Sequence, residues 1–299
     1  MTKNKLKLVT LAIVALFASP AYSNTITYND FSSTAGLTLV GNAATAVTGD
    51  GTVLRLTPAN YWQTGAAYST SPITLGASDT FSTTFQFRIT NPGGINPADG
   101  ITFVLAASPT GLGNAGVGIG YAGVQNSVAI EFDTYNNTGF GLGNNDGNSS
   151  NHIAIDTNGV LTNSALTNVY GVQNCNFSTG LGSGCMSNGD LWTVKIGYNG
   201  SALSVTAQDG TNPVFSAISS YPINVASNLG TTSAYVGFTS GTGAGYENHD
   251  IINWQFANTT ALAPVPEPET YAMLLAGLGL IGFIAYRRKE DSSDLPMAV

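Results

Sequence analysis

The chain has 299 residues, only 9% of which are charged, and its formal net charge at pH 7 is −8. Six of its nine basic residues lie near the two ends, so residues 24–264 hold only Arg55, Arg88 and Lys195 against twelve acidic residues. This balance excludes nucleic acid as a partner and disfavours anionic lipid, because both bind basic surfaces.

The first 23 residues have the organisation of a secretory signal peptide. Three lysines at positions 3, 5 and 7 precede the apolar run LVTLAIVALFA, and Ala21 and Ser23 are small residues placed before a cleavage point. A basic segment, an apolar segment and small residues in this order predict export and removal of residues 1–23. The folded domain is therefore expected to span residues 24–264.

Residues 24–264 carry strand patterns and no sustained helical period. Apolar side chains alternate in FSTTFQFRI, WTVKIGY, LSVTA and AYVGF, which is the period of strands with one buried face. Turn signals separate such runs at Asp50-Gly51, Asn158-Gly159, Asn199-Gly200 and Asp209-Gly210. These patterns predict a single all-β domain, an antiparallel sandwich of two sheets.

The segment IEFDTYNN, residues 130–137, concentrates polar groups in a chain that is poor in charge. On a strand, Glu131, Asp133, Tyr135 and Asn137 point to one face. Two carboxylates this close repel unless a cation lies between them or one retains a proton. The segment therefore predicts either a metal site or an acid/base pair, and the alternative is a solvated polar face of the sandwich.

Two further candidate ligands follow this strand. Asp146 comes nine residues after Asn137, and His152 comes six residues after Asp146. Oxygen ligands suit Ca²⁺, whereas carboxylates with an imidazole suit a transition ion such as Mn²⁺. Two adjacent ions that share carboxylates would explain both the density of ligands and the lack of Lys or Arg nearby.

Cys175 and Cys185 flank the loop NFSTGLGSG. Two nearby cysteines in an exported chain usually pair, so a disulfide is predicted here. Closing this short loop would stabilise the fold by roughly 3 kcal/mol in the chain-entropy model.

The C-terminal segment VPEPETYAMLLAGLGLIGFIAYRRKED joins a Pro-rich stretch to apolar residues 271–286 and a basic cluster at 287–289. Residues 265–290 resemble the PEP-CTERM sorting tail of Gram-negative bacteria, and 291–299 form a polar tail. The resemblance implies a transient membrane anchor, a sorting enzyme in the membrane that cuts it, and a location at the outer surface or extracellular matrix beside exopolysaccharide. A plain C-terminal membrane anchor is the alternative.

Nearly all of residues 25–257 resemble the legume-type (L-type) lectins, and the specific segments are EFDT and ADG. The full series is YSTSPITL, FSTTFQFRI, ADGITFVLA, GIGYAGV, VAIEFDTYNN, HIAIDTNG, YVGFTSGTG and ENHDIINWQF. The resemblance implies a concanavalin A-like jelly-roll sandwich and a metal-dependent carbohydrate-binding protein that is not an enzyme. Homodimers are common among such lectins, and the sequence leaves the oligomeric state open.

The same resemblance assigns the metal ligands. A Mn²⁺-type ion would be held by Glu131, Asp133, Asp146 and His152, and Ca²⁺ by Asp133, Asp146, the backbone carbonyl of Tyr135 and the side chain of Asn137. The step from Asn137 to Asp146 is longer than the family's usual spacing, which keeps Asn144, Asn145 and Asn148 as alternatives to Asp146.

The resemblance also implies a sugar site around Asp99 of the ADG loop. Family members have a cis peptide bond before this residue, here between Ala98 and Asp99. The other implied contacts are a backbone amide of Gly118 or Gly120, the side chain of Asn137, a ring that stacks on the sugar (Tyr135, or alternatively Phe140), and Gly243, Ala244 and Gly245 in the loop SGTGAGYEN.

Two other functions remain as alternatives. Laminarinase-like glycoside hydrolases share this sandwich, but they need a second carboxyl roughly 5–5.5 Å from the first. The positions that would supply it hold Tyr135 and Asn136, so no glycanase activity is expected. The second alternative is a structural matrix protein that has lost sugar binding.

Overall fold

The computed structural model describes residues 21–76, 79–140, 145–261 and 277–278. Most of the predicted signal peptide and of the predicted sorting tail lies outside these described residues. Tyr22–Thr260 forms one compact unit. No helix within the described ranges is both long and apolar enough to cross a membrane.

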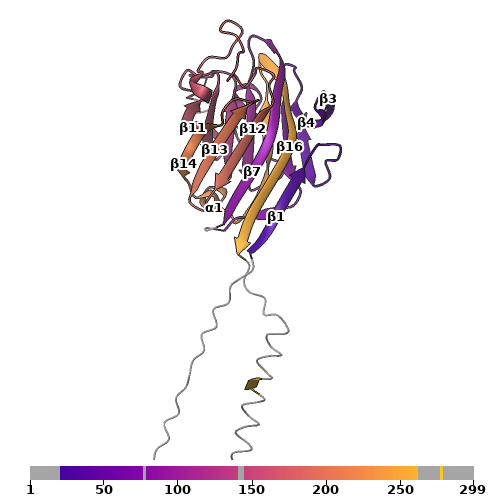
Figure 1. Ribbon diagram of the computed structural model, residues 1–299, viewed down its shortest axis with the longest axis vertical. Coiled ribbons are helices and arrows are strands. Elements are labelled where there is room, and N and C mark those ends of the chain that lie inside the picture. The colour runs from indigo at the N-terminus through magenta and orange to yellow at the C-terminus, as the bar shows by residue number, and fades with distance from the viewer. Residues whose placement is uncertain (1–20, 77–78, 141–144, 262–276, 279–299) are drawn as a thin grey trace, which may run out of the picture. The chain divides into compact units, whose positions relative to one another are not determined.

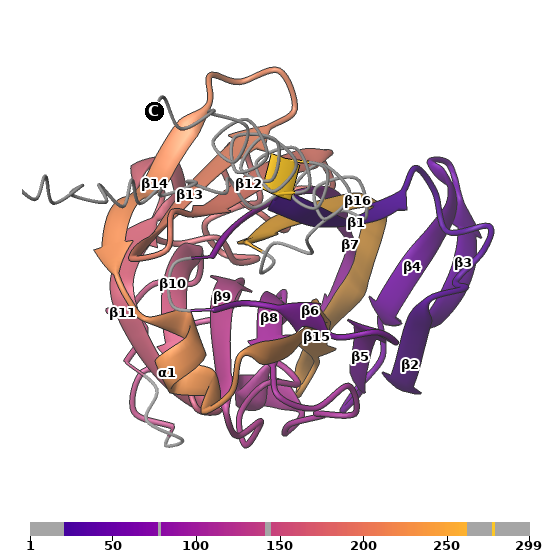
Figure 2. The ribbon, with the colours of Figure 1, turned by 90° about the horizontal axis from the view of Figure 1, so that it is seen from below.

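Two antiparallel sheets face each other in this unit (Figures 1 and 2). The back sheet runs through β14 (Phe215–Pro222), β13 (Ala202–Asp209), β12 (Trp192–Tyr198), β7 (Thr80–Gly94), β16 (Gly245–Ala261), β4 (Gly51–Thr57) and β3 (Ala44–Thr48), with β1 (Ala21–Tyr28) also paired to β16. The front sheet runs through β11 (Val160–Asn168), β10 (His152–Thr157), β9 (Ser127–Asp133), β8 (Gly100–Ala106), β15 (Ser233–Gly241), β5 (Thr64–Ser69) and β2 (Leu37–Gly41), with β6 (Ile73–Thr74) paired to β15. Three short helices, η1 (Gly116–Gly118), η2 (Val169–Gly171) and α1 (Val225–Leu229), lie in the connections. The predicted all-β antiparallel sandwich is confirmed.

The hairpin between β10 and β11 turns at the predicted dipeptide Asn158-Gly159. The backbone angle φ is 60° at Asn158 and 69° at Gly159. A two-residue turn with positive φ at both positions matches the twist of the flanking strands, and Asn and Gly adopt it most easily. The predicted turn dipeptides Asp50-Gly51 and Asn199-Gly200 likewise lie where β3 meets β4 and where β12 meets β13.

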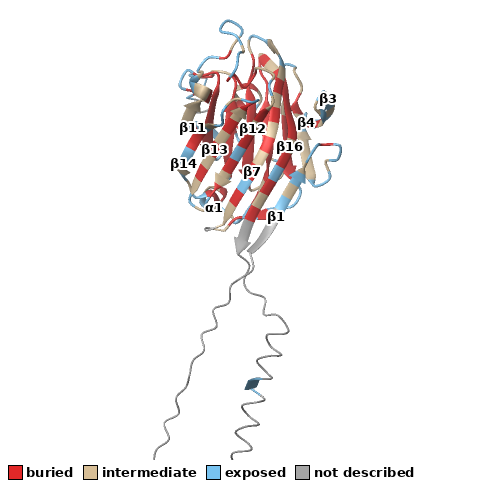
Figure 3. Ribbon diagram, in the orientation of Figure 1, coloured by how far each residue is buried: buried red, intermediate tan, exposed pale blue. Residues whose placement is uncertain are grey.

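Aromatic side chains from both sheets fill the core. Phe132 of β9 packs against Phe85 and Phe87 of β7, with ring centroids 5.7 and 5.8 Å apart. These rings are fully buried, and Figure 3 shows buried residues along the strands of the sheet that contains β7, which faces the viewer. The alternating apolar positions predicted in β7, β12, β13 and β15 all belong to this core. Burial of a Phe side chain contributes roughly 1.5–3 kcal/mol, so Phe132 anchors β9 at its polar end.

The outer face of the front sheet is covered as well. Tyr121 and Val124, from segment 107–126, cluster with apolar residues of β8 and β9 on this face. Every residue of these two strands is buried. The alternative of a solvated polar face is therefore wrong, because Glu131 and Asp133 have no exposed surface.

Candidate functional site

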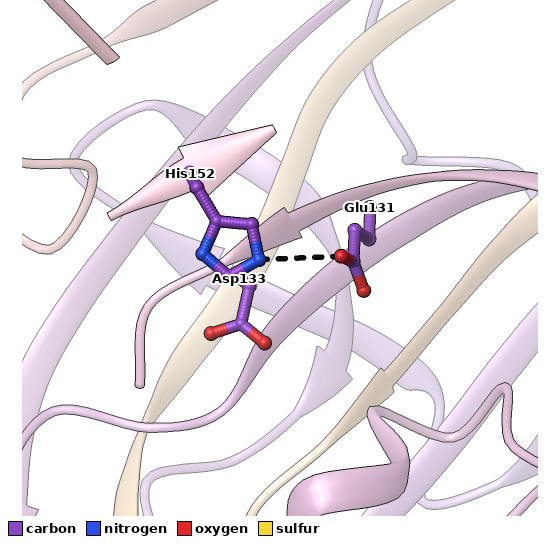
Figure 4. Close-up of side chains that lie close together, drawn as sticks. All are labelled: Glu131, Asp133 and His152. Carbon is purple, nitrogen blue, oxygen red and sulfur yellow. Dashed lines mark hydrogen bonds and ion pairs between the residues drawn. The ribbon is translucent and has the colours of Figure 1, made fainter. Parts of the chain in front are cut away.

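Three of the predicted metal ligands converge between β9 and β10. His152 begins β10 directly opposite Asp133 in the strand register, and Glu131 lies two residues earlier on the same face of β9. One ligand atom from each side chain lies within 4.8 Å of the others, and His152 Nε2 is 3.2 Å from Glu131 Oε1 (Figure 4). A cation of ordinary size can contact all three side chains at once.

Asp146 and Asn137 meet despite the nine residues between them. The backbone amide of Asn137 donates to Asp146 Oδ2, and Asp146 Oδ1 accepts from Asn163 Nδ2 at 2.8 Å. Asp146 is buried, whereas Asn145 and Asn148 are exposed, which favours Asp146 as the ligand of this loop. Asn144 lies outside the described residues.

Among the described residues, the buried acids around β9 have no Lys or Arg partner. Arg55 pairs with Asp250 at 2.7 Å, Arg88 pairs with Asp50 at 2.8 Å, and Lys195 is exposed on β12. In the part of the chain that the structure describes, four buried ligand atoms lack a hydrogen-bond partner: Glu131 Oε2, Asp133 Oδ2, Asn137 Oδ1 and His152 Nδ1. Buried acids of this kind are satisfied by a cation or by retained protons.

The pKa values of these buried acids are shifted by burial, which no nearby Lys or Arg among the described residues offsets. Burial raises the pKa of Glu131 to about 8, and the charge of Asp146 adds to the effect. Burial also raises the pKa of Asp133 well above its usual range, with Asp146 and Glu131 contributing. For His152, burial lowers the pKa, which favours the neutral imidazole that binds metals. The donor set of carboxylates, amide and imidazole fits Ca²⁺ and a Mn²⁺-type ion.

One buried acid of the cluster, Asp156, was missed by the sequence analysis. It lies on β10 four residues after His152, and its Oδ1 accepts from the backbone amide of Asn163 at 2.9 Å. Burial raises its pKa, with a further contribution from the charge of Glu131. The strand period in HIAID was the available signal, because residues 152, 154 and 156 share one face.

Asp99 lies beside the metal-ligand cluster. Gly100 pairs with Asp133 across β8 and β9, and the peptide bond between Ala98 and Asp99 is cis, as predicted. The amide of Asp99 donates to the carbonyl of Gly241 at 3.2 Å, and its carbonyl accepts from the amide of Thr134 at 3.0 Å. Among the residues that the structure describes, none makes a hydrogen bond with Asp99 Oδ2. A carboxylate oxygen held in this way can accept a ligand hydroxyl.

The Gly-rich loop approaches Asp99 through Gly116, which was not among the predicted contacts. A Cβ built on Gly116 would lie 4.0 Å from Asp99 Oδ2. The amides of the predicted residues Gly118 and Gly120 donate to carbonyls of their own loop. Gly116 begins the one-turn helix η1 and Gly118 ends it, and sequence spacing alone does not show which glycine faces the acid.

The other predicted sugar contacts lie at different depths. Gly243 adjoins Asp99, because a Cβ there would lie 3.3 Å from Asp99 Oδ2. Ala244 is half-buried, and its carbonyl accepts from the amide of Ile95. A Cβ on Gly245 would come within 2.2 Å of a backbone oxygen, so this glycine is needed for packing. Tyr135 is half-buried and lines a cavity of about 230 Å³, whereas Phe140 is 72% exposed.

Glu247 supports the backbone around Asp99 from the back sheet. Its Oε1 accepts from Thr134 Oγ1 at 2.5 Å and from Ser187 Oγ at 3.0 Å. Because the amide of Thr134 donates to the carbonyl of Asp99, Glu247 fixes the residue that joins the metal-ligand strand to the ADG loop. His249, two residues after Glu247, is fully buried, and its Nδ1 lies 2.7 Å from Thr57 Oγ1.

The predicted disulfide between Cys175 and Cys185 is confirmed. Its loop contacts the segment that leads into β10. Asn151 Nδ2 donates to the carbonyl of Gly184 at 2.9 Å, and the amide of Met186 donates to Asn151 Oδ1 at 3.0 Å. The disulfide therefore supports the segment immediately before His152.

Comparison with known families identifies the domain. Residues 23–271 match the legume lectin domain. The chain belongs to the legume lectin family. Residues 264–289 of this lectin match the PEP-CTERM protein-sorting motif, which indicates export through a sorting system. Both predicted resemblances are confirmed, and legume lectins are generally metal-binding proteins.

Individual relatives agree with this family. The lectin is 32% identical to truncated lectin 2 of Medicago truncatula, over 72% of this chain and 75% of that protein. It is 29% identical to a probable L-type lectin-domain containing receptor kinase of Arabidopsis thaliana, but spans only 38% of that protein's length. A Bauhinia forficata lectin solved with GalNAc has the same fold, with a TM-score of 0.64 at 22% identity, over 81% of this chain and all of the other. At family level the relatives named as lectins fit a non-enzyme, although the Arabidopsis relative is a receptor kinase.

Proposed function

We propose that this lectin binds a sugar at Asp99 and that its sugar site depends on Ca²⁺ bound by the neighbouring acids. The observation that carries the proposal is a set of buried ligand atoms that have no hydrogen-bond partner among the described residues. One of these ligands, Asp133, pairs across the strands with Gly100, the residue after Asp99. Asp133, Asp146, Asn137 and the carbonyl of Tyr135 would hold Ca²⁺, and Glu131 and His152 would join the two aspartates around a Mn²⁺-type ion. Bound ions would supply the positive charge that lets these acids stay ionised in a buried site.

The groups around Asp99 suit a sugar. The carboxylate of Asp99 accepts hydrogen bonds from sugar hydroxyls, and Gly116 and Gly243 leave space beside it that a side chain would fill. The side chain of Asn137 supplies a further polar contact, and the ring of Tyr135 supplies an apolar surface for the sugar face. The acidic domain favours neutral glycans over anionic ones, because like charges repel.

The sorting motif indicates export through a sorting system. We propose that a membrane sorting enzyme processes the C-terminal segment and that the lectin then associates with exopolysaccharide or the cell surface. A shallow site of this kind binds one sugar weakly, so retention on a polysaccharide comes from many sites on one polymer.

The glycoside hydrolase alternative is disfavoured because the second carboxyl is missing. A retaining glycanase needs two carboxyls roughly 5–5.5 Å apart, and the positions that would supply the second hold Tyr135 and Asn136. The experiment below must distinguish this lectin from a structural matrix protein that binds no sugar.

A metal and glycan assay tests the proposal directly. We expect the purified protein to contain stoichiometric calcium and to bind glycans on an array, with binding lost in EDTA and restored by Ca²⁺. Asp99→Asn should lose binding while keeping its metal and melting temperature, and Asp190→Asn, at an exposed acid, is the matched control. A blank array with calcium present, or full binding by Asp99→Asn, would refute the proposed function.

A further inference from the structure

Trp62 is an exposed aromatic residue that the function described so far does not use. Its side chain lies in the loop between β4 and β5 and is 67% exposed, whereas Trp192 and Trp254, the other two tryptophans of the chain, are fully buried. Within the described residues, its ring has no aromatic partner and its indole N–H makes no hydrogen bond. Large exposed aromatics with a free donor are typical of binding surfaces.

Trp62 lies beside the carboxylate of Asp99. A Cβ built on Gly243 would lie 3.3 Å from Asp99 Oδ2 and 3.7 Å from Trp62 Cζ3. Asp99 Oδ2 and Trp62 Cζ3 are therefore no farther apart than the sum of these two distances. A Cβ on Gly116 would also lie 3.5 Å from Trp62 Cζ3. The two glycines leave space between the indole ring and Asp99 that any side chain would fill.

Hydrogen bonds hold the Trp62 loop against the loop that follows β15. The amide of Trp62 donates to the carbonyl of Gly243 at 3.3 Å. The amide of Gln63 donates to Thr242 Oγ1 at 2.9 Å, and Thr242 Oγ1 donates to the carbonyl of Asn60 at 2.7 Å. The ring is thus presented by a fixed loop, and less conformational freedom is lost when a ligand binds.

The backbone of Trp62 is itself unusual. Its φ of 56° lies in the left-handed region, which bulky residues rarely adopt. Such a conformation persists only where surrounding contacts impose it, and these positions cluster at ligand-binding sites. The loop keeps the largest side chain at a strained position, although a glycine would fit there without strain.

We propose that Trp62 forms a second sugar subsite, in which its indole ring stacks on the pyranose next to the one held by Asp99. This inference rests on the proposed sugar site. Tyr135, on the loop after β9, is the aromatic assigned to the first sugar, and Trp62 comes from a different loop beside Gly116 and Gly243. The occupant is a neutral pyranose, because stacking needs an apolar ring face and because Asp99 and the acidic domain around it disfavour anionic sugars.

Binding of short and long ligands separates the two subsites. The probes are methyl glycosides of neutral hexoses and the neutral di- and trisaccharides that contain them, measured by calorimetry with Ca²⁺ present. We expect Trp62→Ala to weaken binding of the best disaccharide on the order of tenfold, the effect typical of a central aromatic contact, and to leave the monosaccharide within twofold. Trp62→Phe, which keeps a ring, should retain most of the disaccharide affinity.

Tryptophan fluorescence provides a direct readout at the residue itself. Acrylamide quenches exposed indoles, so quenching in this chain reports Trp62 and not the two buried tryptophans. The disaccharide should protect this fluorescence and the monosaccharide should not.

Three results would overturn the subsite. These are equal disaccharide affinity in wild type and Trp62→Ala, quenching unchanged by saturating disaccharide, or tighter monosaccharide binding in Trp62→Ala, which would make the ring a cover over Asp99. If wild-type protein binds no glycan at all, the proposed function fails and the subsite fails with it. If wild type binds and Trp62→Ala is unchanged, only the subsite fails.

Discussion

Removal of bound metal should make the stability of this lectin strongly dependent on pH. Without a cation, the buried acids of β9 must either retain their protons or be ionised without compensation. We therefore expect the chelated protein to lose stability as the pH rises from 5 to 8. The metal-loaded protein should behave oppositely, because the ligands must be deprotonated to bind an ion and acid releases it.

Glu131 shows how large one contribution to this effect is. Its pKa is raised from 4.5 to about 8 in the folded protein, chiefly by burial. Because the folded pKa lies above the unfolded one, the favourable contribution is fully present below the unfolded value and is lost as the pH rises through the folded one. At 1.36 kcal/mol per pKa unit, the difference corresponds to roughly 5 kcal/mol as an upper value. Asp133 shifts in the same direction.

Urea unfolding in EDTA at several pH values between 5 and 8 measures this dependence. Glu131→Gln has nearly the same shape and does not titrate, so its chelated form should show a much flatter profile than wild type. Chelated wild-type protein that is equally stable at pH 5 and pH 8, or a Glu131→Gln profile as steep as that of wild type, would refute this account of the cluster.

Three further outcomes follow from the contacts around the site. Phe132→Ala should lower the free energy of unfolding by about 3–5 kcal/mol in urea titrations. It should also weaken Ca²⁺ affinity in calorimetry, because this ring anchors the strand that carries Glu131 and Asp133. An unchanged metal affinity would contradict that link. Cys175→Ser should cost roughly 3 kcal/mol, and a melting temperature equal to that of wild type would contradict it. Thr134→Val should destabilise the protein by about 1–3 kcal/mol because Glu247 loses a buried donor, and a smaller effect than in an exposed Thr→Val control would count against the support role.

The sequence predicted the parts of the fold that depend on local patterns. Alternating apolar residues marked the core faces of β7, β12, β13 and β15, and the dipeptide Asn158-Gly159 marked a two-residue hairpin. Burial of the outer face of β8 and β9 was not predictable from alternation, because the segment that covers it, 107–126, is largely a loop with no period of its own. The polar residues of β9 therefore looked compatible with a solvated face, although they are fully buried.

In the candidate site, too, residues on paired strands were predicted and residues brought together by loops were not. Glu131, Asp133 and His152 lie on paired strands, and the resemblance to the family brought them together with Asp146. Residues that meet only through loops were harder to foresee. Gly116 and Trp62 lie near Asp99 on connections far apart in the sequence, and neither has a neighbour in sequence that signals this proximity.

Thr134 physically links the metal-ligand strand to the sugar loop. It follows Asp133 directly, its amide donates to the carbonyl of Asp99 at 3.0 Å, and its hydroxyl donates to Glu247 at 2.5 Å. Asp133 in turn accepts from the amide of Tyr135 at 2.7 Å. A change in charge at Asp133 therefore acts on a turn whose next residue holds Asp99 in place. Under the proposed function, this short path would let an ion that does not touch the sugar hold the sugar site in shape.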